Sequence, residues 1–139
     1  MKQQARVNAY HQASRTLAKT RQVVMLYDGA IRLLTQAKEA AAQGDSATRY
    51  VKLARVGEII AVLQSGLDMD SGQAIAHQLQ RFYQAMALKI LHLHYATKLS
   101  DFSDVLEELR QMRMSWDAID RGETAPIAVP KPDAAAYSA

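Results

Sequence analysis

Apolar side chains recur at intervals of three and four residues along most of this 139-residue chain, and this spacing constrains its fold more than any other feature. Because an α-helix turns once every 3.6 residues, side chains at this spacing line one face of a helix. Four long segments show the pattern, and only short polar breaks separate them. The sequence therefore predicts an all-α protein.

The first two predicted helices are joined at a glycine. The first helix runs from about Thr20 to Gln43, and Gly44 is typical of a helix C-terminal stop. Asp45 or Ser46 then supplies the oxygen that caps the start of the second helix. The predicted apolar faces are Val23, Tyr27, Ala30, Leu34 and Ala37 in the first helix, and Leu53, Val56, Ile60, Leu63 and Leu67 in the second.

The third predicted helix runs from about Ser71 to Leu99, and Ser100-Asp101 marks the start of the fourth. Asp70 followed by Gln73 resembles a capping box at the start of the third. The apolar faces are Ile75, Leu79, Phe82, Met86, Ile90, Leu93 and Thr97, and then Phe102, Val105, Leu109, Met112, Trp116 and Ile119. Short connections between long helices favour antiparallel neighbours, so we expect an antiparallel up-down four-helix bundle.

Two flanking segments differ from the predicted bundle, which spans 20–121. Residues 1–19 form a basic N-terminal arm, in which Val7, Tyr10, Ser14 and Leu17 predict a short helix docked on the bundle. Residues 122–139 form an Ala/Pro-rich tail that contains all three prolines, and we expect this tail to be disordered.

The charge and composition exclude several classes of protein. Residues 1–22 carry five basic and no acidic side chains, whereas the rest of the chain is near neutral. Tyr10 is the only aromatic residue in that arm, so the nucleic-acid signal is weak and we expect no nucleic-acid partner. Cysteine is absent from the sequence, and no apolar run approaches the roughly 20 residues that span a bilayer. The N-terminus lacks the apolar stretch of a signal peptide, so we expect a cytoplasmic protein without membrane insertion.

Catalytic and metal-binding patterns are not found in the sequence. His92 and His94 are two residues apart, which on a helix directs their rings roughly 200° apart and prevents them from sharing a metal ion. The sequence contains no Glu-x-x-His motif, phosphate-binding loop or nucleophile elbow. We therefore predict no catalytic, cofactor or metal residues and no enzymatic activity.

Glycines within the predicted helices are the unusual residues. Gly29, Gly57 and Gly66 each cost about 1 kcal/mol relative to alanine inside a helix. Either another helix of the bundle packs closely there, or a partner segment lies in a shallow groove; the sequence leaves both open. Val24 and Ile31 widen the apolar face of the first helix and form an exposed strip unless the arm covers them.

Five short motifs resemble those of FliS-type flagellin export chaperones. In chain order they are NAY at 8–10, VVMLYDGAIR at 23–32, SGLDMDSG at 65–72, FYQAM at 82–86 and MRMSW at 112–116. Each motif is modest by itself, but their order and separations are those of the family. The sequence departs from the family at 19–21, where KTR replaces a common Ser-Pro, and at Gln73 and Gln78, which replace a glycine and an asparagine.

The resemblance implies a non-enzymatic cytoplasmic chaperone. Such proteins bind the disordered C-terminal segment of flagellin, prevent its premature polymerisation and deliver it to a membrane protein of the flagellar type III export gate. They use no cofactor, and a weak homodimer is left open. We expect the partner-binding residues to be Val7, Tyr10, Val24, Tyr27, Gly29, Ile31, Gly57, Gly66, Leu67, Met69, Ile75 and Leu79. The alternatives are a helical adaptor or signalling bundle that binds an amphipathic helix, and a four-helix enzyme or metalloprotein.

Overall fold

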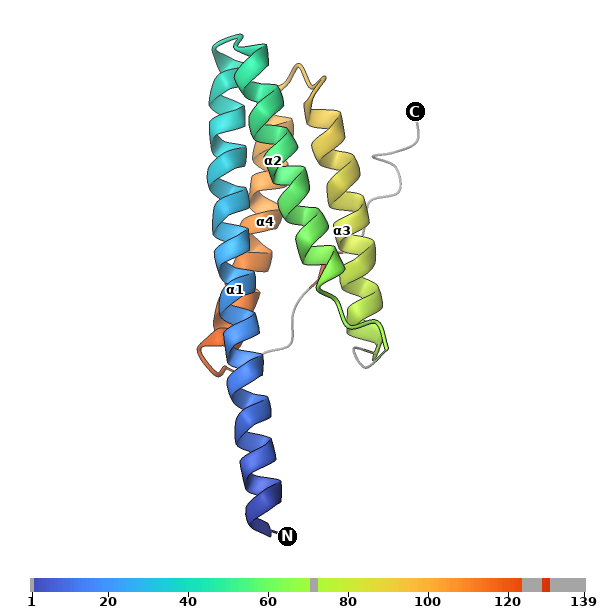
Figure 1. The fold of residues 1–139 in the computed structure, drawn as a ribbon. Coiled ribbons are helices and arrows are strands. Elements are labelled where there is room, and N and C mark those ends of the chain that lie inside the picture. Colours follow the sequence, from blue (N-terminus) through green and yellow to red (C-terminus); the bar gives the residue numbers. More distant parts are fainter. Residues whose placement is uncertain (1, 71–72, 124–128, 131–139) are drawn as a thin grey trace.

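The computed structural model describes residues 2–70, 73–123 and 129–130, and the side chains of 19–70, 74–123 and 129–130. Within these ranges the chain forms four helices: α1 (Lys2–Ala42), α2 (Ser46–Ser65), α3 (Gln73–Leu93) and α4 (Leu99–Asp120). The helices alternate in direction, which confirms the predicted up-down bundle (Figure 1). No helix in the described residues is both long enough and apolar enough to cross a membrane.

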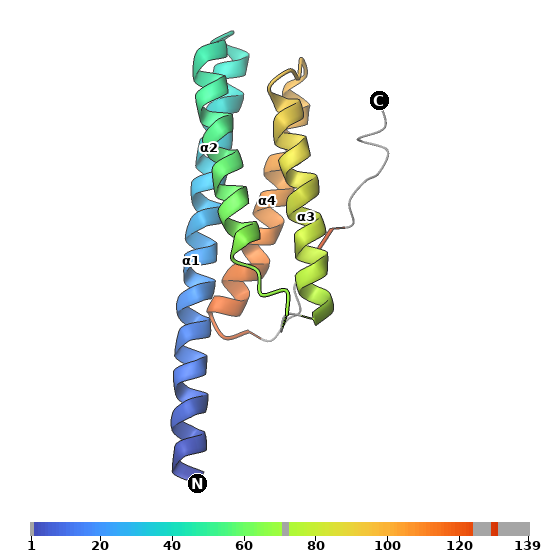
Figure 2. The same ribbon diagram turned by 45° about the vertical axis from the view of Figure 1, so that its right-hand side comes forward.

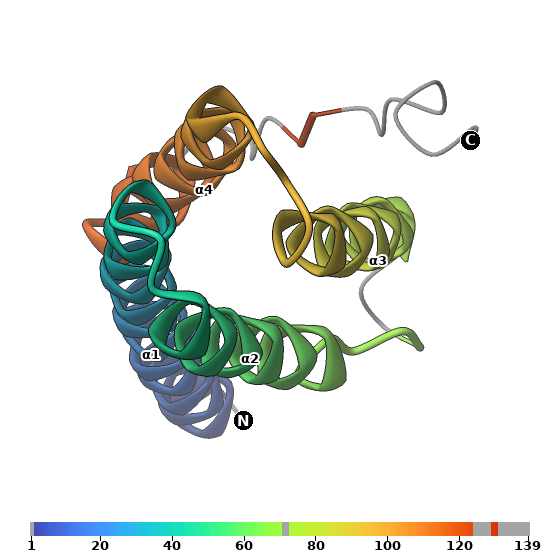
Figure 3. The same cartoon turned by 90° about the horizontal axis from the view of Figure 1, so that it is seen from above.

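The bundle is arranged around α1, which packs against α2 on one side and α4 on the other. Viewed along the bundle, α3 faces α1 across the core and lies nearer to α2 than to α4 (Figure 3). The predicted apolar faces supply most of the core, including the fully buried Leu34, Leu53 and Phe102. Six residues of the predicted faces lie toward the edge of the bundle: Ile75 and Thr97 are exposed, and Val23, Leu67, Trp116 and Ile119 are half-buried.

The turn between α1 and α2 has the predicted chemistry. Gly44 has a φ of 73°, a left-handed conformation that glycine adopts without steric cost. Asp45 follows as the N-cap of α2, and its side chain accepts a hydrogen bond of 3.0 Å from the backbone N–H of Thr48. That bond lowers the pKa of the Asp45 carboxyl. The aspartate therefore caps α2 in its charged form at neutral pH.

Three helix boundaries differ from those expected. The first helix begins at Lys2 rather than near Thr20, so the arm and the first bundle helix form one continuous helix that extends beyond the other three (Figure 2). No proline lies between Lys2 and Ala42 to interrupt it. The third helix ends at Leu93 because the N–H groups of His94 and Tyr95 bond three residues back and close a tight last turn. The fourth helix begins at Leu99, before the expected Ser100.

Two sequence predictions lie wholly or mostly outside the described residues. The side chain of Gln73, and with it the expected capping box, is not described. The expected disorder of 122–139 stays a prediction, since only Gly122, Glu123, Val129 and Pro130 of that segment are described. Gly122, which follows the C-cap Arg121 of α4, has a φ of 81°, and Val129 is half-buried against the core.

Several polar contacts tie the helices together. Arg113 of α4 pairs with Asp28 of α1 at 2.6 Å. The Lys89 ammonium of α3 and the Glu108 carboxylate of α4 are also 2.6 Å apart. Two further contacts between α1 and α4 are hydrogen bonds, Lys38 to Ser103 at 2.9 Å and Thr20 to Asp120 at 3.0 Å. Because such contacts contribute at most about 1 kcal/mol each near a surface, they adjust helix register more than they determine stability.

Candidate functional site

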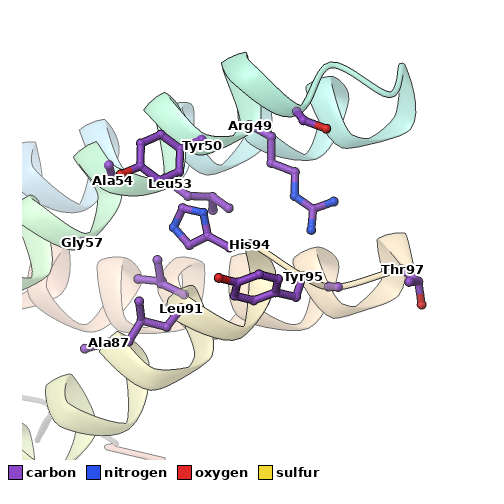
Figure 4. A pocket seen from close by; sticks show the side chains of 13 residues that line it. Arg49, Tyr50, Leu53, Ala54, Gly57, Ala87, Leu91, His94, Tyr95 and Thr97 are labelled. Atoms are coloured by element: carbon purple, nitrogen blue, oxygen red, sulfur yellow. The ribbon is translucent and has the colours of Figure 1, made fainter.

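An open groove lies between α2 and α3 near the end of the bundle where α3 passes into α4. It has a volume of about 780 Å³. We call it the α2–α3 groove, and Figure 4 shows most of its side chains. It is lined by Ser46, Arg49, Tyr50, Leu53, Ala54 and Gly57 from α2, and by Ala87, Ile90, Leu91, His94, Tyr95, Ala96 and Thr97 from α3 and the turn that follows it.

The floor and walls of the groove are mainly apolar. On α2, Tyr50, Ala54 and Gly57 follow one another at helical spacing. On the other side, Ala87 and Leu91 of α3 and His94, directly after its end, have the same spacing. Most of these residues directly follow a buried residue in the sequence, as Ala54 follows Leu53 and Leu91 follows Ile90. The two lines therefore lie beside the helix faces that form the core. Tyr50, Leu91 and Tyr95 are 64%, 60% and 85% exposed. An unusual amount of apolar and aromatic surface therefore faces solvent here.

Gly57 widens the groove at its centre. A methyl group built on its α-carbon meets no atom within 4 Å, so the missing side chain leaves open space and no neighbouring helix requires the glycine. Because glycine costs about 1 kcal/mol in a helix interior, its presence is not explained by the stability of α2. The absence of a side chain at Gly57 instead allows a molecule bound in the groove to approach the backbone of α2 closely.

The end of the groove nearest the α3–α4 turn is polar. Arg49 extends from α2 toward this turn, and the His94 ring lies opposite, between the two helices (Figure 4). The guanidinium of Arg49 lies 5.6 Å from the centre of the buried Phe102 ring, within cation–π distance. The rings of Tyr50 and His94 lie 5.3 Å apart. Partial burial, and secondarily the charge of Arg49, lower the pKa of His94, so this histidine is neutral at pH 7.

A second, smaller hollow of about 340 Å³ lies toward the other end of the bundle, and we call it the Trp116 hollow. It is lined by Lys19, Thr20, Gln22, Val23 and Leu26 of α1, by Val62, Leu63, Gly66 and Leu67 of α2 and its C-terminal end, and by Tyr83 and Trp116. All four helices contribute to it. It is more apolar than the α2–α3 groove and shares no residue with it.

A buried polar pair lies beneath this hollow. The hydroxyls of Tyr27 and Tyr83 are joined by a hydrogen bond of 2.9 Å. Burial raises the pKa of Tyr83 to about 12 and that of Tyr27 further, so both phenols are neutral at physiological pH. The Trp116 indole N–H lies near enough to lower both pKa values, yet it makes no hydrogen bond of standard geometry with the described residues. The Tyr27–Tyr83 hydrogen bond joins α1 to α3, and Trp116 of α4 lies close to it.

Reactive groups are not assembled in either hollow. Across the described part of the chain, no three histidine or acidic side chains gather where they could share a metal ion. The two predicted histidines have separate surroundings, since exposed His92 lies 4.0 Å from Asp101 while His94 faces the groove. Both hollows offer apolar burial and a few polar groups, which is the usual composition of a binding pocket.

Comparison with known proteins gives the family. Residues 1–123 match the profile of the family described as "Flagellar protein FliS". The chain belongs to the FliS family. It is also 34% identical, over 97 residues, to the protein named flagellar secretion chaperone FliS of Vibrio cholerae serotype O1; the alignment covers 70% of this chain and 71% of that protein. Family and relative together support a role as a flagellar export chaperone, and the resemblance based on five motifs is confirmed.

Of the residues expected to bind a FliS-type partner, three line the two hollows. Gly57 lines the α2–α3 groove, and Gly66 and Leu67 line the Trp116 hollow. Gly66 is the C-cap of α2 rather than an interior residue. Gly29 lines neither hollow; a methyl group built there would meet Ile59 of α2 at 3.5 Å, an ordinary van der Waals contact.

The remaining expected residues are scattered. The predicted exposed strip through Val24 is wrong, because Val24 is 7% exposed and lies in the core; Tyr27 and Leu79 are buried as well. Ile31 is half-buried against the core, Met69 is half-buried after α2, and Ile75 is exposed on α3. The side chains of Val7 and Tyr10 lie outside the described set. Partner contact at these residues stays a prediction.

The sequence analysis did not predict the residues that supply the aromatic and charged side chains of the α2–α3 groove. Arg49, Tyr50, Leu91, His94 and Tyr95 were not predicted as site residues, although each lines the groove. The spacing of Tyr50, Ala54 and Gly57 is visible in the sequence, and it places them on one face of α2 beside the core residues. This spacing indicates a groove only when the position of α3 opposite that face is known.

Proposed function

We propose that this protein is a non-enzymatic chaperone that binds the disordered C-terminal segment of flagellin in the cytoplasm before secretion. While bound, the segment cannot polymerise with other flagellin molecules. The loaded chaperone then delivers its cargo to the membrane protein of the flagellar export gate. Membership in the FliS family and the similarity to a flagellar secretion chaperone support this proposal.

The observation that carries the proposal is the α2–α3 groove, an open apolar channel with an interior glycine and exposed aromatic walls. A disordered segment that folds into such a groove gains apolar burial but loses conformational entropy. Its net affinity is therefore lower than the contact area alone suggests, which suits a chaperone that must release cargo. The Trp116 hollow offers a second anchoring point for a segment that continues along the bundle.

Calorimetric titration with the C-terminal segment of the host's flagellin tests the function. We expect saturable binding with a negative heat-capacity change, together with a gain in helical circular dichroism as the segment folds. Flagellin that lacks this segment serves as the control and should give no signal. If the truncated flagellin bound equally well, the proposal would be wrong. Binding of a helix that is already folded, without gain in helicity, would favour the adaptor alternative.

The tryptophan fluorescence of the protein reports on the second hollow. Trp116 is the only tryptophan, it is half-buried, and it lines the Trp116 hollow. Its emission in the free protein should therefore lie between the values for buried and fully solvated tryptophan. When the flagellin segment is added, we expect a blue shift and less quenching by acrylamide, because the segment removes water from the hollow. An emission spectrum that stays constant at saturation would show that the cargo leaves this hollow empty.

A further inference from the structure

We propose that the α2–α3 groove selects an acidic amphipathic helix, whose apolar face lies on the groove floor and whose carboxylate pairs with Arg49. This inference rests on the proposed function and specifies the chemistry of the cargo segment that the groove accepts. Three observations support it: the shape of the groove, the distribution of charge around it, and the position of Arg49 over Phe102 without a carboxylate partner among the described residues.

The shape of the groove suits a short helix. Its lining on α2 extends from Ser46 to Gly57, a rise of roughly 16 Å or three helical turns. Leu91 and Ala54 provide apolar contact from the two walls, and Gly57 allows close approach of a backbone. A helix placed there can present apolar residues at positions i, i+3, i+4 and i+7, the usual pattern of helix-in-groove recognition.

The two helices that form the groove carry a net positive charge. Helix α2 carries three basic residues and one acidic residue. Helix α3 carries Arg81 and Lys89 with no acidic residue, although Lys89 is paired with Glu108 of α4. By contrast, α4 carries six acidic and two basic residues. Among the groove-lining residues none is acidic, and Arg49 is the one side chain that is charged at neutral pH. The potential over the groove therefore favours a negatively charged occupant.

Arg49 is held in place and has no carboxylate partner among the described residues. Its half-buried guanidinium lies over the ring of Phe102, which restricts its motion at the polar end of the groove. Because a guanidinium offers five N–H donors in a planar fork, it can bind a carboxylate through two parallel hydrogen bonds. Since the neighbouring His94 is neutral at pH 7, Arg49 supplies the positive charge at this end of the groove.

Three synthetic amphipathic peptides with the same apolar stripe test the inference. Their flanking positions are Glu in the first, Gln in the second and Lys in the third. We expect wild-type protein to bind the Glu peptide about five- to tenfold more tightly than the Lys peptide, with the Gln peptide between them. Higher salt should narrow the difference, because the pair is partly exposed to solvent.

Two substitutions at Arg49 and one control locate the preference. Arg49→Glu should reverse the order of the peptides, and Arg49→Gln should reduce the differences to less than about twofold. Arg55→Glu makes the same change of charge at an exposed position of α2 outside the groove, and it should keep the wild-type order. Melting temperatures establish that each variant is folded. Equal binding of all three peptides by wild type, or an unchanged order in Arg49→Glu, would overturn the inference.

Titration of the same proteins with the flagellin C-terminal segment separates this inference from the proposed function. If that segment binds wild type while the peptides show no dependence on charge, the inference fails and the chaperone function stands. If the segment does not bind while the peptides keep their order, the chaperone proposal fails and the groove still selects acidic helices. Self-association that occupies the groove, detected by sedimentation, would assign it to a second copy of the chain and overturn the inference.

Discussion

Gly57→Leu is expected to weaken binding of the flagellin segment on the order of a hundredfold while it raises the melting temperature. The leucine side chain enters the open space over Gly57 and occupies the centre of the α2–α3 groove, where it excludes a docked helix. The same change replaces a poor helix former with a good one, which stabilises α2 by about 1 kcal/mol. Titration calorimetry and thermal unfolding measure the two effects on one sample.

Gly57→Ala is the matched control for this experiment. It gives α2 a similar gain in helix propensity but adds a single methyl group, which meets no atom within 4 Å. We expect greater stability with binding within a few-fold of wild type. Wild-type affinity in Gly57→Leu would exclude the groove as the cargo site, whereas a loss of stability in both variants would mean that α2 requires a glycine there.

Tyr27→Ala is expected to lower the free energy of unfolding by about 3–5 kcal/mol, a large share of the roughly 5–15 kcal/mol that a domain of this kind possesses. Tyr27 is completely buried, and its removal leaves a cavity and deprives the Tyr83 hydroxyl of its partner. Tyr27→Phe keeps the ring and removes only the hydroxyl, so a smaller loss of about 1–3 kcal/mol is expected. Urea unfolding measures both losses.

Met25→Ala provides the comparison on the same helix. Met25 is 65% exposed, so its truncation should change stability by less than about 0.5 kcal/mol. These variants also decide the role of Tyr27, which the sequence suggested as a partner contact. A Tyr27→Ala protein with unchanged stability and lost binding would restore that role. Loss of stability, with binding failing only as the fold fails, would identify Tyr27 as a core residue.

The helical architecture was predictable from the sequence because it depends on local physical rules. The 3,4 spacing of apolar residues predicted the core faces of all four helices, and Gly44-Asp45 predicted the turn between α1 and α2. The boundaries were less predictable, since no strong stop separates the arm from the first helix. The end of α3 at Leu93 depends on a tight turn that carries no glycine or proline signal.

The candidate site was only partly predictable. The excess of helical glycine indicated close approaches, and Gly57 does line the groove. Gly29 gives the same signal in the sequence but faces Ile59, so sequence alone cannot separate a groove from a packed contact. Val24 illustrates the opposite error, because a widened apolar face on a helix with two neighbours is buried rather than exposed.

The sequence by itself determined the fold class, the order of the helices and the family, since each depends on residues close together in the chain or on motifs in a set order. Tertiary structure alone decided where cargo can bind. Arg49 and His94 lie 45 positions apart in the numbering, and they meet at one end of the groove because α2 and α3 run antiparallel. A groove forms only where the faces of two helices lie opposite each other, and the apolar spacing within one helix does not show which face of another helix will lie opposite it.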